Sequence, residues 1–109
     1  MTLALVNDKY GQAAQEDRCG PRVTLNIPAM MRPSGASPFP TVLIDLSIGG
    51  FAAQAVTGIR AGSLCWLTIG PFKGLQAEVV WNDGQVVGCA FATLLNPAIF
   101  ESIVNRRQV

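Results

Sequence analysis

Two short groups of residues in this chain have the types and spacing to bind an anion or a nucleobase. The first is a pair of arginines, Arg18 and Arg22, separated by Cys19-Gly20-Pro21. Because Gly20-Pro21 excludes a continuous helix, the pair is expected in a bent, extended segment where both guanidinium groups could reach one ligand. A guanidinium binds phosphate, or the O6/N7 edge of guanine, through paired hydrogen bonds. Taken alone, the spacing is more typical of two solvated arginines.

The second group follows an apolar run and consists of Asp45, Ser47 and the pair Gly49-Gly50. Side chains alternate along a strand, so Asp45 and Ser47 are predicted to point outward together. The glycines would let a ligand approach the backbone and would permit a positive φ. Alternatively, Asp45 and Ser47 only cap the turn by accepting bonds from backbone N–H groups, which these residues alone favour. The same alternation assigns four apolar residues to the core: Val42, Ile44, Leu46 and Ile48.

Composition limits the class of protein. With 109 residues, of which half are apolar and 14% are charged, the chain suits one domain with a packed core. A net charge of +1 argues against binding a nucleic-acid duplex, so any anion must be bound by a few placed cations. No apolar run approaches a membrane span and the first ten residues do not form a signal peptide. We therefore expect a cytoplasmic protein without membrane insertion.

Histidine is absent, which removes most zinc sites and the Ser-His and Cys-His nucleophile pairs. We expect a protein that is not an enzyme and has no metal or cofactor. Cys19, Cys65 and Cys89 are odd in number and contain no C-x-x-C, which favours reduced structural thiols. Cys19 lies between the two arginines, which could lower its pKa, so a redox role at Cys19 stays open.

Period-2 patterns interrupted by turn residues predict about six strands, which favours a sandwich or a closed barrel. The long interval 29–40, with three prolines, is predicted to be a loop, and Asp83-Gly84 a tight turn. Trp66 and Trp81 are expected in the core rather than as stacking surfaces. Met30-Met31 is a candidate exposed surface. The predicted strands are 22–28, 41–46, 51–56, 63–69, 76–81 and 85–91.

Near the end of the sequence, the spacing of the apolar residues changes from that of a strand to that of a helix. This predicts one amphipathic helix over residues 96–107. Asn96 can cap it and Pro97 suits its first turn. Its apolar stripe should pack over an open end of the barrel. The stripe consists of Ile99, Phe100, Ile103 and Val104.

The order of the two groups and the strand pattern together resemble the PilZ domain family of bacterial cyclic di-GMP receptors. The family pattern is Arg-x-x-x-Arg before the first strand and Asp/Asn-x-Ser-x-x-Gly after the second, and the later segment with Trp81, Gly88 and Phe91 is also similar. The resemblance covers roughly residues 16–106. It implies an all-β fold, a six-stranded antiparallel split β-barrel with a C-terminal α-helix. A tail over 1–15 would precede a PilZ-like domain over 16–109.

By this resemblance, cyclic di-GMP would bind on the outside of the barrel. Arg18 and Arg22 would bind its phosphates and guanine edges, and Asp45 would accept hydrogen bonds from a guanine. Ser47 would add a polar contact, and the backbone of Gly49 and Gly50 would let the base approach. Many relatives carry a further arginine where this chain has Asp17, which bears on affinity and on the number of ligand molecules bound.

The sequence thus predicts a cyclic di-GMP sensor in which ligand binding orders the N-terminal segment and changes the surface offered to a downstream protein partner. One alternative is a protein-interaction adaptor of the same fold that works without nucleotide. Another is a split-barrel flavin-binding protein, which the absence of histidine and of a phosphate-binding loop disfavours.

Overall fold

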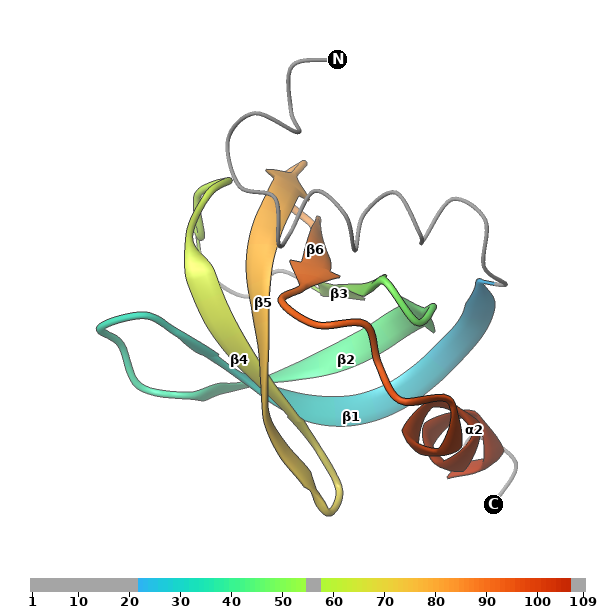
Figure 1. Ribbon diagram of the computed structural model, residues 1–109. Coiled ribbons are helices and arrows are strands. Elements are labelled where there is room, and N and C mark those ends of the chain that lie inside the picture. The colour runs from blue at the N-terminus through green and yellow to red at the C-terminus, as the bar shows by residue number, and fades with distance from the viewer. Residues whose placement is uncertain (1–21, 55–57, 107–109) are drawn as a thin grey trace.

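The computed structural model describes residues 22–54 and 58–106, so the predicted tail 1–15, Arg18 and Cys19 lie outside the described residues. Along the described chain six strands precede one helix (Figure 1). The elements are β1 (Val23–Pro33), β2 (Phe39–Leu46), β3 (Gly50–Gln54), β4 (Leu64–Ile69), β5 (Phe72–Asn82), β6 (Val86–Phe91) and α2 (Pro97–Arg106).

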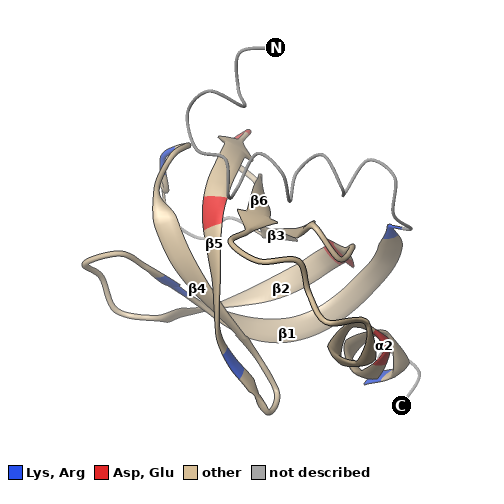
Figure 2. Ribbon diagram, viewed as in Figure 1, with Lys and Arg blue, Asp and Glu red and all other residues tan. Residues whose placement is uncertain are grey.

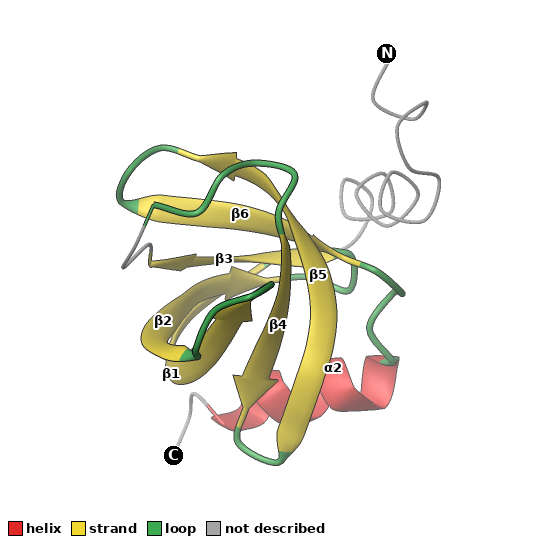
Figure 3. Ribbon diagram, turned by 90° about the vertical axis from the view of Figure 1, so that its left-hand side faces the viewer, coloured by secondary structure: helices red, strands yellow, loops and turns green. Residues whose placement is uncertain are grey.

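The strands form a closed barrel in the order β1-β2-β3-β6-β5-β4, and every neighbouring pair is antiparallel. Figure 3 shows the helix lying outside the strands, at the end of the barrel that carries the β4–β5 turn. The predicted six-stranded antiparallel barrel with a C-terminal helix is therefore confirmed. No helix among the described residues is long and apolar enough to cross a membrane.

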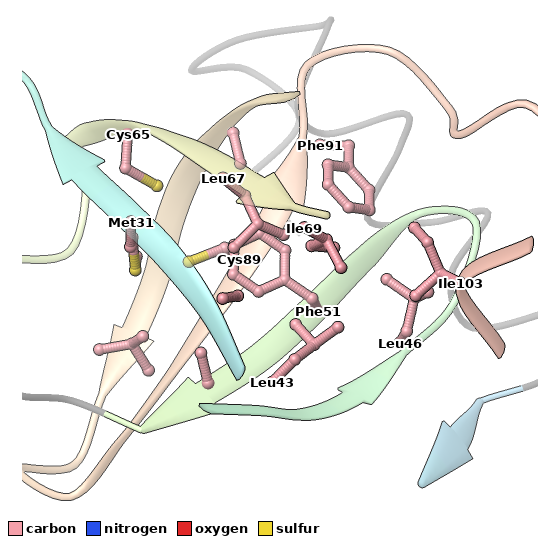
Figure 4. Close-up of a cluster of buried hydrophobic side chains, with 14 of the residues drawn as sticks. Met31, Leu43, Leu46, Phe51, Cys65, Leu67, Ile69, Cys89, Phe91 and Ile103 are labelled. Carbon is pink, nitrogen blue, oxygen red and sulfur yellow. The ribbon is translucent and has the colours of Figure 1, made fainter. Parts of the chain in front are cut away.

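The interior of the barrel is filled by alternate side chains of the strands (Figure 4). Phe51 and Phe91 lie with ring centroids 5.3 Å apart, tilted by 43°, within the range in which aromatic pairs attract. Each large side chain removed from water contributes about 1.5–3 kcal/mol. Fully enclosed members of this core include Met31, Leu43, Leu46, Leu67, Ile69, Val79 and Val87.

Helix α2 begins and packs as the sequence predicts. The side chain of Asn96 accepts a hydrogen bond of 2.7 Å from the backbone N–H of Ala98, which caps the helix. Phe100 and Ile103 are buried, and Ile103 lies beside Leu46 of β2 in the core (Figure 4). At the other end, the Arg106 guanidinium lies 5.9 Å from the Phe72 ring centroid. The helix therefore packs against both the end of β2 and the β4–β5 turn.

The β5–β6 turn also follows its sequence. The Asp83 carboxylate accepts hydrogen bonds of 2.9 Å and 2.8 Å from the backbone N–H groups of Gln85 and Val86. These two bonds lower the pKa of Asp83, because they stabilise the charged form. Gly84 adopts φ +96°, which a residue with a side chain rarely does.

Strand β1 is longer than predicted. It continues through Pro33, so most of the interval that the sequence predicts as a loop is paired with β2 and β4. The prediction that Met30-Met31 forms an exposed surface is wrong for Met31, which is fully buried, whereas Met30 is 39% exposed. Strand alternation explains the difference, because adjacent residues of an extended chain point to opposite faces.

The predicted core face of β2 is wrong in part, because the strand contains an irregularity. Leu43 pairs with Ala53 of β3, but Asp45 pairs with Ala52, so two steps along β2 match one step along β3. Such a bulge places two successive residues on the same face. Val42 and Ile44 are consequently only half-buried, Asp45 faces outward, and Leu46 returns to the core.

Strands β3 and β6 approach closely at Gly50. A Cβ atom built there would lie 2.3 Å from the backbone carbonyl oxygen of Cys89. That oxygen belongs to a paired strand and cannot move away alone. Gly50 has no positive φ, contrary to one use that the sequence suggested for it. Its missing side chain is needed for strand packing.

Substitution of Gly50 should therefore destabilise the barrel itself. We expect Gly50→Ala to lower the free energy of unfolding by about 1–3 kcal/mol or more, as overpacking in a core does. Urea denaturation followed by circular dichroism measures the change. Gly58→Ala is the matched control, because a Cβ there meets no atom within 4 Å and the loss should stay below about 0.5 kcal/mol. Equal stabilities of the two variants would contradict this account of Gly50.

Candidate ligand-binding site

The pairing of β1 with β2 joins the two groups of residues that the sequence singles out. Val23 pairs with Leu46, and Thr24 with Asp45, so Arg22, immediately before β1, lies next to the end of β2. The Arg22 Nη1 atom lies 2.6 Å from the Asp45 Oδ1 atom. Figure 2 shows a basic position where β1 begins and an acidic position where β2 ends, on the same side of the barrel. Residues 23 positions apart are thereby brought into direct contact.

This ion pair is open to solvent, with the Arg22 side chain 47% exposed and that of Asp45 24% exposed. Exposed pairs of this kind contribute little to folding stability, because water and salt screen them. Both groups are therefore accessible to a ligand that offers them better partners. A guanidinium presents donors and a carboxylate presents acceptors, so together they match a molecule that carries both kinds of group.

A small hollow of about 100 Å³ lies beside Arg22 on the outer face of β3, β6 and β5. Arg22 is the one charged residue among the described residues that line it. Gly49, Ala52, Gly88 and Ala90 contribute little or no side chain, so their backbone is close to the space above. Such a floor suits a flat group that needs close approach to the backbone.

Trp81 forms one wall of the hollow, contrary to its predicted place in the core. Its side chain is 47% exposed. The cause is a second bulge: Val79 pairs with Cys89, but Trp81 pairs with Gly88, so two steps along β5 match one along β6. Val80 and Trp81 both face outward as a result, and Val79 alone is buried. An exposed indole beside an arginine is a surface on which a base can stack.

Ser47 does not point outward, and that prediction is wrong. Its side chain is fully buried, and its Oγ accepts a hydrogen bond of 3.2 Å from the backbone N–H of Gly49. The Ser47 backbone N–H also donates to the Gly50 carbonyl over 2.9 Å. β2 ends at Leu46, so Ser47 lies in the following turn, where the strand alternation on which the prediction relied no longer applies. Ser47 therefore holds the turn that follows β2, which is the role that the alternative interpretation of the sequence gives it.

The same turn is bonded to the chain that leads into the helix. The Gly49 carbonyl accepts from the Phe91 N–H over 3.0 Å, and the Ile48 carbonyl accepts from the Leu95 N–H over 2.8 Å. The backbone carbonyl groups of Ile48 and Gly49 in this turn are therefore hydrogen-bonded within the protein. Gly49 nevertheless lines the hollow.

Among the predicted site residues, the structure brings together Arg22, Asp45 and Gly49, whereas Arg18 lies outside the described residues. Trp81 and Gly88 belong to the family resemblance, but the sequence does not predict that they line the site. The run Val79-Val80-Trp81 is the sequence signal for an exposed apolar side chain here. Successive side chains of a strand point to opposite faces, so three apolar residues in a row cannot all face the interior of the barrel.

The two described cysteines lie in the core and not in the site (Figure 4). A hydrogen bond from Cys89 lowers the pKa of Cys65, against the effect of burial, and the same bond together with burial raises the pKa of Cys89. In the described ranges 22–54 and 58–106, no group of three or more histidine, cysteine, aspartate or glutamate residues could hold a metal ion.

A comparison with protein families adds to this geometry. The model of the PilZ domain family matches residues 16–105, which is most of the chain. The protein belongs to the PilZ family. PilZ domains typically bind cyclic di-GMP and are generally receptor domains without catalytic activity. A search of curated proteins gives no match to this PilZ domain.

The site residues should differ in what they contribute to stability. Arg22→Ala or Asp45→Ala should change the free energy of unfolding by less than about 1 kcal/mol, because the pair is exposed. Ser47→Ala should cost about 1–3 kcal/mol, because it leaves a buried N–H of Gly49 without its acceptor. Thermal or urea unfolding of the three variants measures this. A larger loss in Arg22→Ala than in Ser47→Ala would contradict the assignment.

Proposed function

We propose that this PilZ domain is a receptor for cyclic di-GMP that binds the ligand on the outside of its barrel, at Arg22, Asp45 and the hollow beside them. The observation that carries the proposal is the 2.6 Å contact between Arg22 and Asp45, next to a hollow lined by an exposed tryptophan and by residues with small side chains. Membership of a family that typically binds this nucleotide supports it.

The donors and acceptors of the site complement those of the ligand. Guanine presents O6 and N7 as acceptors, and the phosphodiester groups carry negative charge, so Arg22 can bind either. The N1–H and N2–H groups of guanine are donors, for which the Asp45 carboxylate is the matching acceptor. Arg18, four residues before Arg22 in the family's arginine pattern, is assigned a second contact to phosphate or guanine.

The hollow offers surfaces against which the flat guanine ring can pack. A guanine ring above Gly49 would meet backbone, and one face of the ring can stack on the Trp81 indole. Ser47 and Gly50 take part indirectly in this proposal. Ser47 holds the turn through Gly49, and Gly50 allows β3 to lie close to β6.

Isothermal titration calorimetry with cyclic di-GMP tests the proposal. The unsubstituted protein should bind, and Arg22→Ala should weaken binding by about tenfold or more, because a hydrogen bond to a charged group contributes about 1.5–3 kcal/mol. Since a charged ligand is involved, the affinity should also fall as salt concentration rises. Absence of any binding heat at high micromolar ligand would contradict the proposal.

Arg32→Ala is the matched control for this titration. Arg32 is an exposed arginine whose guanidinium lies 4.4 Å from the Trp66 ring centroid, and it lines a separate hollow with Met30, Pro38 and Thr68. Loss of this charge should leave the affinity within about twofold, since it removes net charge but no ligand contact. Equal weakening by Arg22→Ala and Arg32→Ala would indicate attraction by overall charge instead of a defined site.

Ligand binding should also restrain the segment before β1. If Arg18 and Arg22 bind one ligand molecule, the three residues between them are held against the barrel, and Cys19 is one of these. We therefore expect cyclic di-GMP to slow alkylation of Cys19 several-fold, with mass spectrometry as the measurement. Cys65 and Cys89 are buried and give little background. An alkylation rate that is the same with and without bound ligand would contradict the ordering of this segment.

A further inference from the structure

The indole of Trp81 on β5 lies unusually close to the backbone of Gly88 on the neighbouring strand β6. They are paired residues in the register of the two strands. A Cβ atom built on Gly88 would lie 2.2 Å from the indole Cε2 atom, 2.3 Å from Nε1 and 2.6 Å from Cζ2. The indole of Trp81 therefore occupies the space in which any side chain at position 88 would stand.

The backbone at position 88 does not itself require glycine. Gly88 has no positive φ, in contrast to Gly84, whose φ is +96° and whose missing side chain faces open space. Glycine weakens a strand interior, since it adds conformational entropy to the unfolded chain and packs nothing. Glycine at position 88 is thus explained by one contact, the packing of the Trp81 indole against its backbone.

We propose that Gly88 is a positioning residue for the ligand site, acting by holding the Trp81 indole down against β6 so that it stands as a wall beside Arg22. This inference rests on the function proposed above. The indole keeps 47% of its surface exposed, so one face stays available while the other is supported by the strand. A base that stacks on a wall already in place loses less of its binding energy to ordering that wall.

An alanine at position 88 would push the indole away from β6. Three indole atoms lie within 2.6 Å of the new Cβ, and contacts below 3.0 Å require movement. The tryptophan side chain is free to turn toward solvent, because it is half exposed. The strand pairing can then persist while the wall of the hollow is lost. The substitution should therefore affect the ligand much more than the fold.

A double-mutant cycle on the full chain tests this, with cyclic di-GMP affinities from calorimetry. Gly88→Ala should weaken binding about tenfold, the order expected when a base–aromatic contact is lost, and Trp81→Ala should weaken it similarly. In the Trp81→Ala background, Gly88→Ala should have no further effect, because position 88 acts only through the indole. Gly58→Ala, a glycine with open space around it, should bind as the unsubstituted protein does.

Equal weakening by Gly88→Ala with and without Trp81 would overturn the positioning role and indicate a direct contact or a fold defect. Unchanged binding in Gly88→Ala would overturn it as well. Urea denaturation of each variant identifies a fold defect.

A second readout requires no ligand. The Gly88 Hα protons lie against the indole, so in the NMR spectrum they should be shifted by its ring current, and Trp81→Ala should abolish that shift. In a Trp66→Phe background, Gly88→Ala should also change the fluorescence of the remaining Trp81. If the unsubstituted protein does not bind cyclic di-GMP, the proposed function and the ligand part of this inference both fail. If the ring-current shift is absent, the positioning role fails even if the protein binds cyclic di-GMP.

Discussion

The Arg22–Asp45 pair at the centre of the site depends on a backbone irregularity, the bulge between Leu43 and Asp45 in β2. Without it, strict alternation would place Asp45 on the same face as Leu43, inside the barrel, where an ionised carboxylate is costly. With it, Asp45 turns outward to meet Arg22 at 2.6 Å, while Leu46 returns to the core. β2 ends there, and Ser47 is buried in the turn that follows. The same distortion therefore exposes the charged group and keeps the neighbouring Leu46 in the core. Bulges commonly re-aim a side chain in this way near binding sites.

The second requirement is close packing at two glycines, of which Gly88 lines the hollow and Gly50 does not. Gly50 admits the carbonyl of Cys89, and Gly88 admits the indole of Trp81. Gly50 therefore allows the barrel strands to pack, and Gly88 has the positioning role that we propose for the wall of the hollow. The turn between β2 and β3 is tied through Ile48 and Gly49 to the chain that enters α2. A ligand on this turn would thus contact a part of the protein that is fixed to the helix as well as to the barrel.

Regular parts of the fold could be predicted from local pattern, and irregular parts could not. β4, β6 and α2 lie within one residue of their predicted bounds at the ends that the structure describes, because Gly, Pro and Asn signals flank them. β1 was predicted too short, since the prolines of 28–40 suggested a loop although Pro28 and Pro33 lie within the strand. Trp81 faces outward, contrary to the prediction, because a bulge shifts alternation by one residue, and a bulge is set by pairing with a distant strand. Ser47 is buried, contrary to the prediction, because β2 ends at Leu46 and strand alternation does not extend into the turn. That Arg22 and Asp45 belong to one site followed from the family resemblance and not from spacing, and their direct contact was not predicted.

The most direct test of the central claim is a titration of the isotope-labelled protein with cyclic di-GMP, followed by NMR. The chain has two indole N–H signals, one from Trp81 in the proposed site and one from Trp66, which lies against Arg32 in a separate hollow. We predict that the signals of Trp81, Arg22, Asp45 and Gly49 shift, while that of Trp66 stays in place. Shifts centred on Trp66, or no shifts at saturating ligand, would contradict the proposal that the nucleotide binds beside the Arg22–Asp45 pair.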